Sequence, residues 1–150
     1  MKIKELIFPI FAFILLSMAC NFGDTRNIRM TVDGDEISAE NAQIAISQIG
    51  SESFYVLLAT KRPEIKIVWE TRFKDIERWR GMKIRAKKFR AVYSNNNVSF
   101  EEPDLGIIVE ITDVDGTFVS GKISGSVGVG AGTHRVSNGT FRAPASFWKR

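Results

Sequence analysis

The residues best suited to chemistry in this sequence are a run of basic side chains. From Lys83 to Tyr93, basic and apolar residues alternate with a period of two, once a bulge at Lys87 and Lys88 is allowed. This alternation predicts a strand with one buried apolar face and one exposed basic face. The exposed face, named here the basic ridge, comprises Lys83, Arg85, Lys87, Lys88 and Arg90, with Arg78 and Arg80 just before the strand.

Two interpretations of the basic ridge stay open. Neighbouring cations attract polyanions, so the ridge suits anionic glycans or lipid headgroups. Lysine-rich edge strands also prevent sheets from pairing with other chains, and this role requires no ligand. Nucleic acid is not expected as a partner, because the sequence contains no nucleic-acid recognition module.

Charge is unevenly distributed along the chain. The whole sequence has a formal charge of +4. The stretch 61–90 holds 12 Lys or Arg against 4 acidic residues, whereas 91–116 holds 6 acidic residues and no basic one. This distribution predicts a domain whose surface is electrically divided.

Acidic residues offer the main route to an enzyme. The candidates are Glu101, Glu102, Asp104, Glu110, Asp113 and Asp115. A glycan-directed hydrolase would need two of these carboxyl groups to converge at about 5 to 9.5 Å. Asp113-Val-Asp-Gly116 lacks the downstream Glu of a calcium loop and is typical of a hairpin turn. The hydrolase is therefore kept as an alternative, and no metal is predicted.

Other catalytic patterns are incomplete. His134 is the only histidine, and no Gly-x-Ser-x-Gly segment accompanies it. Gly116 to Lys122 has the spacing of a phosphate-binding loop, but Ile123 occupies the required Ser or Thr position. Gly128 to Gly132 begins like a dinucleotide loop and then has Thr133 at the third glycine position. We expect no catalytic residue and no cofactor.

The first 19 residues have the layout of a secretory signal peptide. Lys2 and Lys4 precede 13 uncharged residues, Leu6 to Met18, a run too short for a confident membrane-spanning helix. The only cysteine, Cys20, follows Ala19. This arrangement resembles a bacterial lipobox, although Ser17 occupies the position where the family usually has leucine.

The resemblance implies cleavage before Cys20 and a lipid, including palmitate, on that residue. Looser lipoboxes of this type occur in Bacteroidetes and spirochaetes. A mature chain of 131 residues would then have no free thiol and would be held to the membrane by several acyl chains. Asn21 is not the Asp that retains enteric lipoproteins in the inner membrane, so we expect an outer-membrane address in the cell envelope.

The remaining sequence predicts an all-β domain. Residues 20–27 form an expected tether of at most about 27 Å, residues 28–144 an antiparallel sandwich or barrel of about eight to nine strands, and residues 145–150 a tail. Asp33-Gly34 predicts a hairpin turn. One short helix is expected within 72–80, because Phe73, Ile76 and Trp79 recur every three residues before Gly81. Trp69, Trp79 and Trp148 are expected in the core or covering it.

The C-terminal half resembles a known group of proteins. Asp115-Gly-Thr-Phe118 and Asn138-Gly-Thr-Phe141 repeat one pattern, each expected as a turn that leads into a strand. Over Gly81 to Ala143 the chain resembles small lipid-anchored β-sandwich domains of Bacteroidetes lipoproteins. That resemblance implies a fold and an address, but no activity or site residue. We therefore expect a non-catalytic lipoprotein that binds an envelope or surface partner. The alternatives are the hydrolase and a protein-binding inhibitor or assembly factor.

Overall fold

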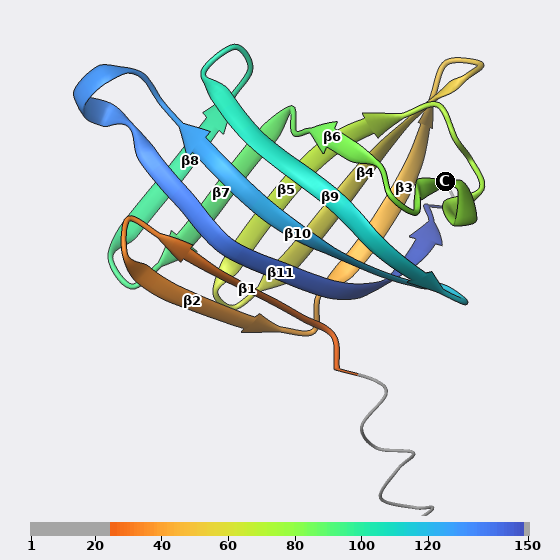
Figure 1. The fold of residues 1–150 in the computed structure, drawn as a ribbon, viewed down its shortest axis with the longest axis horizontal. Coiled ribbons are helices and arrows are strands. Elements are labelled where there is room, and N and C mark those ends of the chain that lie inside the picture. The colour runs from red at the N-terminus through yellow and green to blue at the C-terminus, as the bar shows by residue number, and fades with distance from the viewer. Residues whose placement is uncertain (1–24, 149–150) are drawn as a thin grey trace, which may run out of the picture.

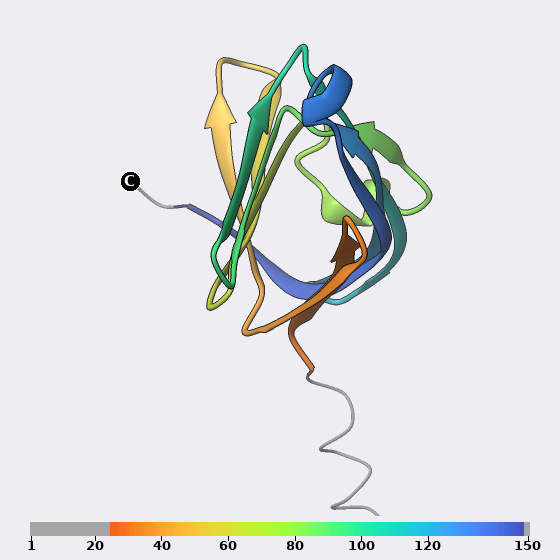
Figure 2. The ribbon, with the colours of Figure 1, turned by 90° about the vertical axis from the view of Figure 1, so that its left-hand side faces the viewer.

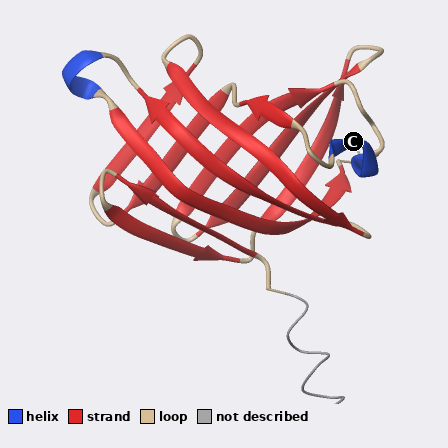
Figure 3. Ribbon diagram, in the orientation of Figure 1, coloured by secondary structure: helices blue, strands red, loops and turns tan. Residues whose placement is uncertain are grey.

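The computed structural model describes residues 25–148, and strands dominate this part of the chain (Figure 3). The expected signal peptide and Cys20 lie outside the described residues. The eleven strands are β1 (Asn27–Val32), β2 (Asp35–Glu40), β3 (Gln43–Ile49), β4 (Ser53–Lys61), β5 (Glu64–Thr71), β6 (Lys83–Arg85), β7 (Lys88–Tyr93), β8 (Asn96–Glu101), β9 (Leu105–Asp115), β10 (Phe118–Val127) and β11 (His134–Phe147). Two short 3₁₀ helices, η2 (Ile76–Trp79) and η3 (Gly130–Gly132), complete it. The prediction of an all-β fold is confirmed.

The strands form one open sheet that folds over into two facing layers (Figures 1 and 2). Layer A contains β2, β1, β11, β10, β9 and β6 in that order, and layer B contains β3, β4, β5, β7 and β8. Strand β11 joins them, because its first part pairs with β1 and β10 while Ala145–Phe147 pairs with Ile44–Ile46 of β3.

Two details of the predicted fold were wrong. The β11 to β3 pair is parallel, so the sheet is mixed rather than purely antiparallel. There are eleven strands rather than eight or nine, in part because the strand expected from Lys83 to Tyr93 is two strands, β6 and β7. The boundaries also differ, because Asn27 already belongs to β1 and β11 continues through Phe147 into the expected tail.

Turn residues explain most hairpins. Asp33 and Gly34 both have positive φ, at 52° and 91°, which is the geometry of a tight two-residue hairpin, and Val32 pairs with Asp35 across it. The β7 to β8 turn lies at Ser94 and Asn95, and Tyr93 pairs with Asn96 across it.

The two copies of the repeat, Asp115-Gly-Thr-Phe118 and Asn138-Gly-Thr-Phe141, have different structures. At Gly116 it is a hairpin turn, as expected. Asn138, by contrast, lies inside β11 with φ of 51°, where the register with β1 shifts, so it forms a bulge and not a turn. A bulge bends a strand and increases its twist, and β11 must curve to pass from layer A to layer B.

The expected helix within 72–80 is only the four-residue η2. The segment is held at both ends, because Phe73 N donates to Thr71 Oγ1 at 3.1 Å and Gly81 N donates to the Ile111 carbonyl at 2.8 Å. This leaves room for a single turn, which Asp75 caps by accepting from Glu77 N at 3.1 Å.

Apolar side chains from both layers fill the space between them. Trp69 of β5 and Trp79 of η2 are fully buried, as expected, and their rings meet edge to face with centroids 6.3 Å apart. Trp79 Nε1 donates to the Phe73 carbonyl at 2.9 Å, which fixes η2 over one end of the core. Trp148 differs from both, because 68% of its surface is exposed. Across residues 25–148, no helix has the length and apolar character needed to cross a membrane.

Candidate functional site

The basic ridge is divided between the two layers. Lys83 and Arg85 lie on β6 beside β9, whereas Lys88 and Arg90 lie on β7 between β5 and β8. The expected bulge is instead the point where the chain changes layer. Ala86 N donates to the Ile107 carbonyl of layer A at 2.9 Å, and Lys87 N donates to the Val68 carbonyl of layer B at 2.7 Å. The predicted single strand was therefore wrong, although the alternation of buried and exposed residues holds.

Carboxylates accompany most cations of the basic ridge. Lys88 lies 3.2 Å from Glu101, and Lys83 lies 4.0 Å from Glu110. The remaining pairs are Lys87 with Glu70 at 3.3 Å and Glu102 at 3.4 Å, Arg90 with Glu64 at 3.2 Å, and Arg80 with Glu77 at 3.3 Å and Asp113 at 3.5 Å. The predicted electrical division was wrong, because basic β6 and β7 pair with acidic β9 and β8. Binding of an anion at the ridge stays a prediction.

The other ridge cations contact the fold itself. Arg85 Nε donates to the Leu105 carbonyl at 3.0 Å, and Arg80 donates to the Val114 carbonyl at 2.6 Å. The Arg78 guanidinium lies 4.0 Å from the centre of the Phe73 ring. Hydrogen bonds and charge from Glu70, and then from Glu102, raise the pKa of Lys87. These contacts tie η2, β6 and β7 to their neighbours.

The acidic candidates are spread over several elements. Glu101 belongs to β8, Glu102 and Asp104 to the turn after it, and Glu110, Asp113 and Asp115 to β9. Asp115 lies 3.9 Å from Arg142. No group of three or more His, Cys, Asp or Glu side chains suited to a metal ion occurs within residues 25–148.

His134 connects the β1 to β2 turn with the start of β11. Its Nδ1 lies 2.5 Å from Asp33 Oδ2, and Arg135 N donates to Asp33 Oδ1 at 2.8 Å. The bond with His134, followed by that with Arg135, lowers the pKa of Asp33. Burial, with the charges of Asp33 and Asp35, raises the pKa of Tyr93. The sequence could not reveal this contact, since it joins residues 101 positions apart.

The outer face of layer B is built from the regular strands β3, β4 and β5. Register places three rows of side chains on it. They are Gln43, Ala59 and Lys66; Ala45, Leu57 and Val68; and Ser47, Tyr55 and Glu70. The middle row is apolar and half-buried. This face therefore has an apolar strip with polar or charged groups on both sides.

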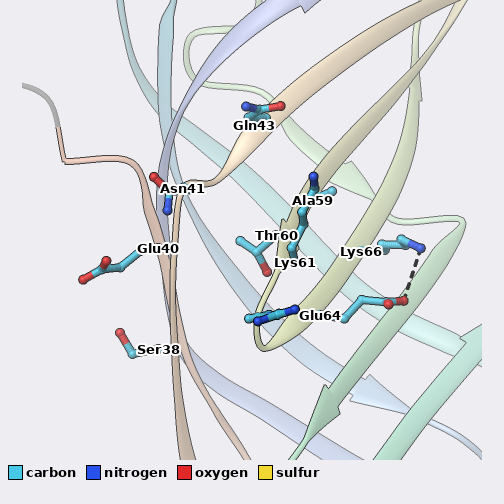
Figure 4. Close-up of a pocket in the computed structure, with 10 residues that line it drawn as sticks. Ser38, Glu40, Asn41, Gln43, Ala59, Thr60, Lys61, Glu64 and Lys66 are labelled. Atoms are coloured by element: carbon cyan, nitrogen blue, oxygen red, sulfur yellow. Dashed lines mark ion pairs between the residues drawn. The ribbon is translucent and has the colours of Figure 1, made fainter.

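A groove lies at one end of this face, between β2 and the β4 to β5 turn (Figure 4). It has a volume of about 980 Å³. Its lining is polar and charged: Ser38, Glu40, Asn41, Gln43, Ala59, Thr60, Lys61, Arg62, Glu64 and Lys66. Glu64 Oε1 lies 3.2 Å from both Lys66 Nζ and Arg90 Nε, so its charge is compensated. Thr60 Oγ1 donates to the Pro63 carbonyl at 2.7 Å and shapes the turn.

Aromatic side chains gather at the other end of the face. Trp148 N donates to the Ile46 carbonyl at 2.8 Å, which sets Trp148 beside Ser47, the register partner of Tyr55. Trp148, Ser47, Gln48 and Gly50 line a hollow of about 600 Å³. Tyr55 is 41% exposed. We name Trp148, Ser47, Gln48 and Tyr55 the aromatic row.

No protein-family model, curated protein or solved structure matches this chain.

The aromatic row was not predicted from the sequence. One signal was present, because Tyr55 alternates with the buried Phe54 and Val56 and must therefore face outward. The sequence around Trp148 contained no such signal, since the position of Trp148 depends on the parallel pairing of β11 with β3.

Proposed function

We propose that this protein is a lipid-anchored, non-catalytic domain that binds a glycan chain of the cell envelope on the outer face of layer B. The observation that carries this proposal is the aromatic row, in which Trp148 and Tyr55 stand exposed on either side of Ser47. The lipid anchor rests on Cys20 and the segment before it, and an outer-membrane address rests on Asn21.

The spacing of the row suits a chain of sugar rings. Ser47 and Tyr55 belong to β3 and β4, and Trp148 directly follows β11, so the three residues lie on successive neighbours in the sheet. Neighbouring strands lie about 4.8 Å apart, so the two aromatic side chains begin about 10 Å apart. The small Ser47 leaves the space between them open. A pyranose ring has an apolar face of C–H groups that stacks on an aromatic ring, and its hydroxyl groups bond to polar neighbours.

Polar partners lie beside these rings. Gln48 shares the hollow with Trp148, and its Nε2 donates to the Gly50 carbonyl at 3.0 Å, leaving its oxygen as an acceptor. Glu70, the other register partner of Tyr55, lies 3.3 Å from Lys87. The row therefore offers both stacking surfaces and hydrogen-bonding groups, which is the combination that sugar recognition requires.

The exposed parts of the Trp148 and Tyr55 rings contribute little to the stability of the fold. Burying a large apolar side chain stabilises a fold by about 1.5 to 3 kcal/mol, and an aromatic ring left in water forgoes much of that gain. Phe147, next in the chain, does contribute by packing edge to face on Phe54 with centroids 6.4 Å apart. Trp148 and Tyr55 are available to a ligand.

Affinity electrophoresis tests glycan binding. The unlipidated chain from residue 20, with Cys20→Ser, is run through gels that contain either peptidoglycan fragments or delipidated surface polysaccharide. We expect one of these gels to retard the protein, and Trp148→Ala or Tyr55→Ala to weaken binding about tenfold, the value of one lost stacking contact. Val129→Ala is the matched control, because Val129 is 69% exposed and lies outside the row. Equal retardation of all variants, or no retardation in either gel, would refute the proposal.

Metabolic labelling tests the anchor separately. Radiolabelled palmitate should be incorporated into the wild-type protein and not into Cys20→Ala. Protease treatment of intact and lysed cells then determines the orientation, because a surface domain is cleaved before lysis and a periplasmic one only afterwards. Absence of label from the wild type would refute the anchor.

A further inference from the structure

Three cations that line hollows beside the start of β1 lack ion pairs of the kind found at the basic ridge. Arg29, Lys61 and Arg62 are exposed, and within residues 25–148 none of them has a carboxylate at ion-pair distance. Among the ridge residues, by contrast, Lys87 and Arg80 each contact two carboxylates. The charges of Arg29, Lys61 and Arg62 are therefore not offset at ion-pair distance by any carboxylate of the described residues.

These cations surround the point where the chain enters the domain. Thr25 and Arg29 line a hollow of about 480 Å³, and Lys61 and Arg62 line the groove of Figure 4. The two hollows adjoin, because both are lined by Ser38, Glu40 and Asn41. Figure 1 shows the β2 to β3 connection close to the start of β1. We name this surface the tether end, defined by Arg29, Lys61, Arg62, Glu40 and Asn41.

Charge at the tether end is positive. Glu40 is a carboxylate there with no cation at ion-pair distance among the described residues, and Glu64 is already compensated by Lys66 and Arg90. Amide and hydroxyl groups of Asn41 and Ser38 lie between the cations and can donate to phosphate oxygens.

We propose that the tether end docks on the anionic phospholipid headgroups of the membrane that carries the anchor. This inference rests on the proposed lipid anchor at Cys20. Thr25 lies five residues after Cys20, a separation that spans at most about 18 Å. Screening limits attraction to about 8 Å at physiological ionic strength, and a tether this short keeps the surface where it meets the headgroups repeatedly. Docking gives the domain a defined orientation on the membrane.

Vesicle co-sedimentation tests the docking without the native lipid. The Cys20→Ser chain is mixed with vesicles of phosphatidylglycerol and phosphatidylcholine, or of phosphatidylcholine alone, at about 0.1 M salt. We expect the wild type to prefer the anionic vesicles. The triple variant Arg29→Gln, Lys61→Gln and Arg62→Gln should lower partitioning on the order of 100-fold, since each basic residue near an anionic surface contributes about fivefold.

A matched control separates docking from net charge. Lys83→Gln, Lys88→Gln and Arg90→Gln also removes three positive charges, but from the basic ridge, and should change partitioning less than about threefold if the tether end is the contact. Glu40→Gln should raise partitioning by about fivefold. Unfolding midpoints close to the wild-type value confirm that each variant folds.

The outcomes are separable from those of the proposed function. Equal losses in both triple variants, unchanged partitioning of the tether-end variant, or equal binding to both vesicle types would overturn the docking. Selective loss in the tether-end variant supports it even if palmitate labelling fails, in which case only the lipid anchor is refuted. Glycan binding at the aromatic row is read in a different assay and does not depend on either result.

Discussion

Gly121 is a position in layer A where the sheet has no room for a side chain. It lies on β10 between its register partners Ile111 of β9 and Phe141 of β11. A methyl group added to Gly121 would meet the Glu110 carbonyl oxygen and come within 2.5 Å of the Phe141 ring. Phe141 is buried, with 3% of its surface exposed, so the ring has little space to withdraw.

The expected cost of Gly121→Ala follows from these two contacts. Forcing an extra methyl group into a packed core costs about 1 to 3 kcal/mol, and here one neighbour is backbone that cannot rotate away. Alanine also lowers the entropy of the unfolded chain, which offsets about 0.4 to 1 kcal/mol. We therefore expect a net loss of about 1 to 2 kcal/mol in the free energy of unfolding, or about 4 to 8 °C in Tm at about 4 °C per kcal/mol.

Urea denaturation followed by tryptophan fluorescence measures this change. Gly132→Ala is the matched control, because an added methyl group there meets nothing within 4 Å. That variant should stay within about 0.5 kcal/mol of the wild type or gain stability. If Gly121→Ala is as stable as Gly132→Ala, the close packing of β9, β10 and β11 described above is wrong.

Two further predictions concern the ends of the sandwich. The lowered pKa of Asp33 means that its bonds stabilise the fold at neutral pH and are lost as the pH falls from about 4 through the folded-state value. Because the pair with His134 is exposed, Asp33→Asn should cost at most about 1 kcal/mol in the free energy of unfolding at pH 7. The difference from the wild type should shrink in urea titrations at about pH 3. Trp79→Phe removes the donor to the Phe73 carbonyl and part of a fully buried ring, so we expect a loss of about 1 to 3 kcal/mol and a weaker near-ultraviolet circular dichroism signal from its contact with Trp69.

Local signals in the sequence predicted the strands well where alternation was long. Ile65, Ile67 and Trp69 occupy alternate positions of β5 and all three are buried. Asp33-Gly34 predicted its hairpin because only residues that tolerate positive φ fit there. The change of layer between β6 and β7 was read as a bulge, because a two-residue interruption of the pattern looks the same in either case.

Contacts between distant segments could not be predicted. The pairing of Lys88 with Glu101 and of Lys83 with Glu110 depends on which strands are neighbours, and the distribution of charge along the sequence does not reveal this. The aromatic row likewise depends on β11 reaching β3. Candidate site residues chosen by local charge therefore lie mostly in internal ion pairs, while the exposed cations of the tether end come from β1, the end of β4 and the turn after it.

The dual membership of β11 has a consequence for export. This strand follows all the others in the chain, yet it completes layer A and provides the edge on which β3 of layer B pairs. The fold cannot close until these residues are available, and the pairing of β11 with β1 joins the two ends of the domain. Such long-range pairing slows folding. We expect a newly made chain to remain unfolded until its last strand is available, a property that suits the export implied by the proposed lipid anchor.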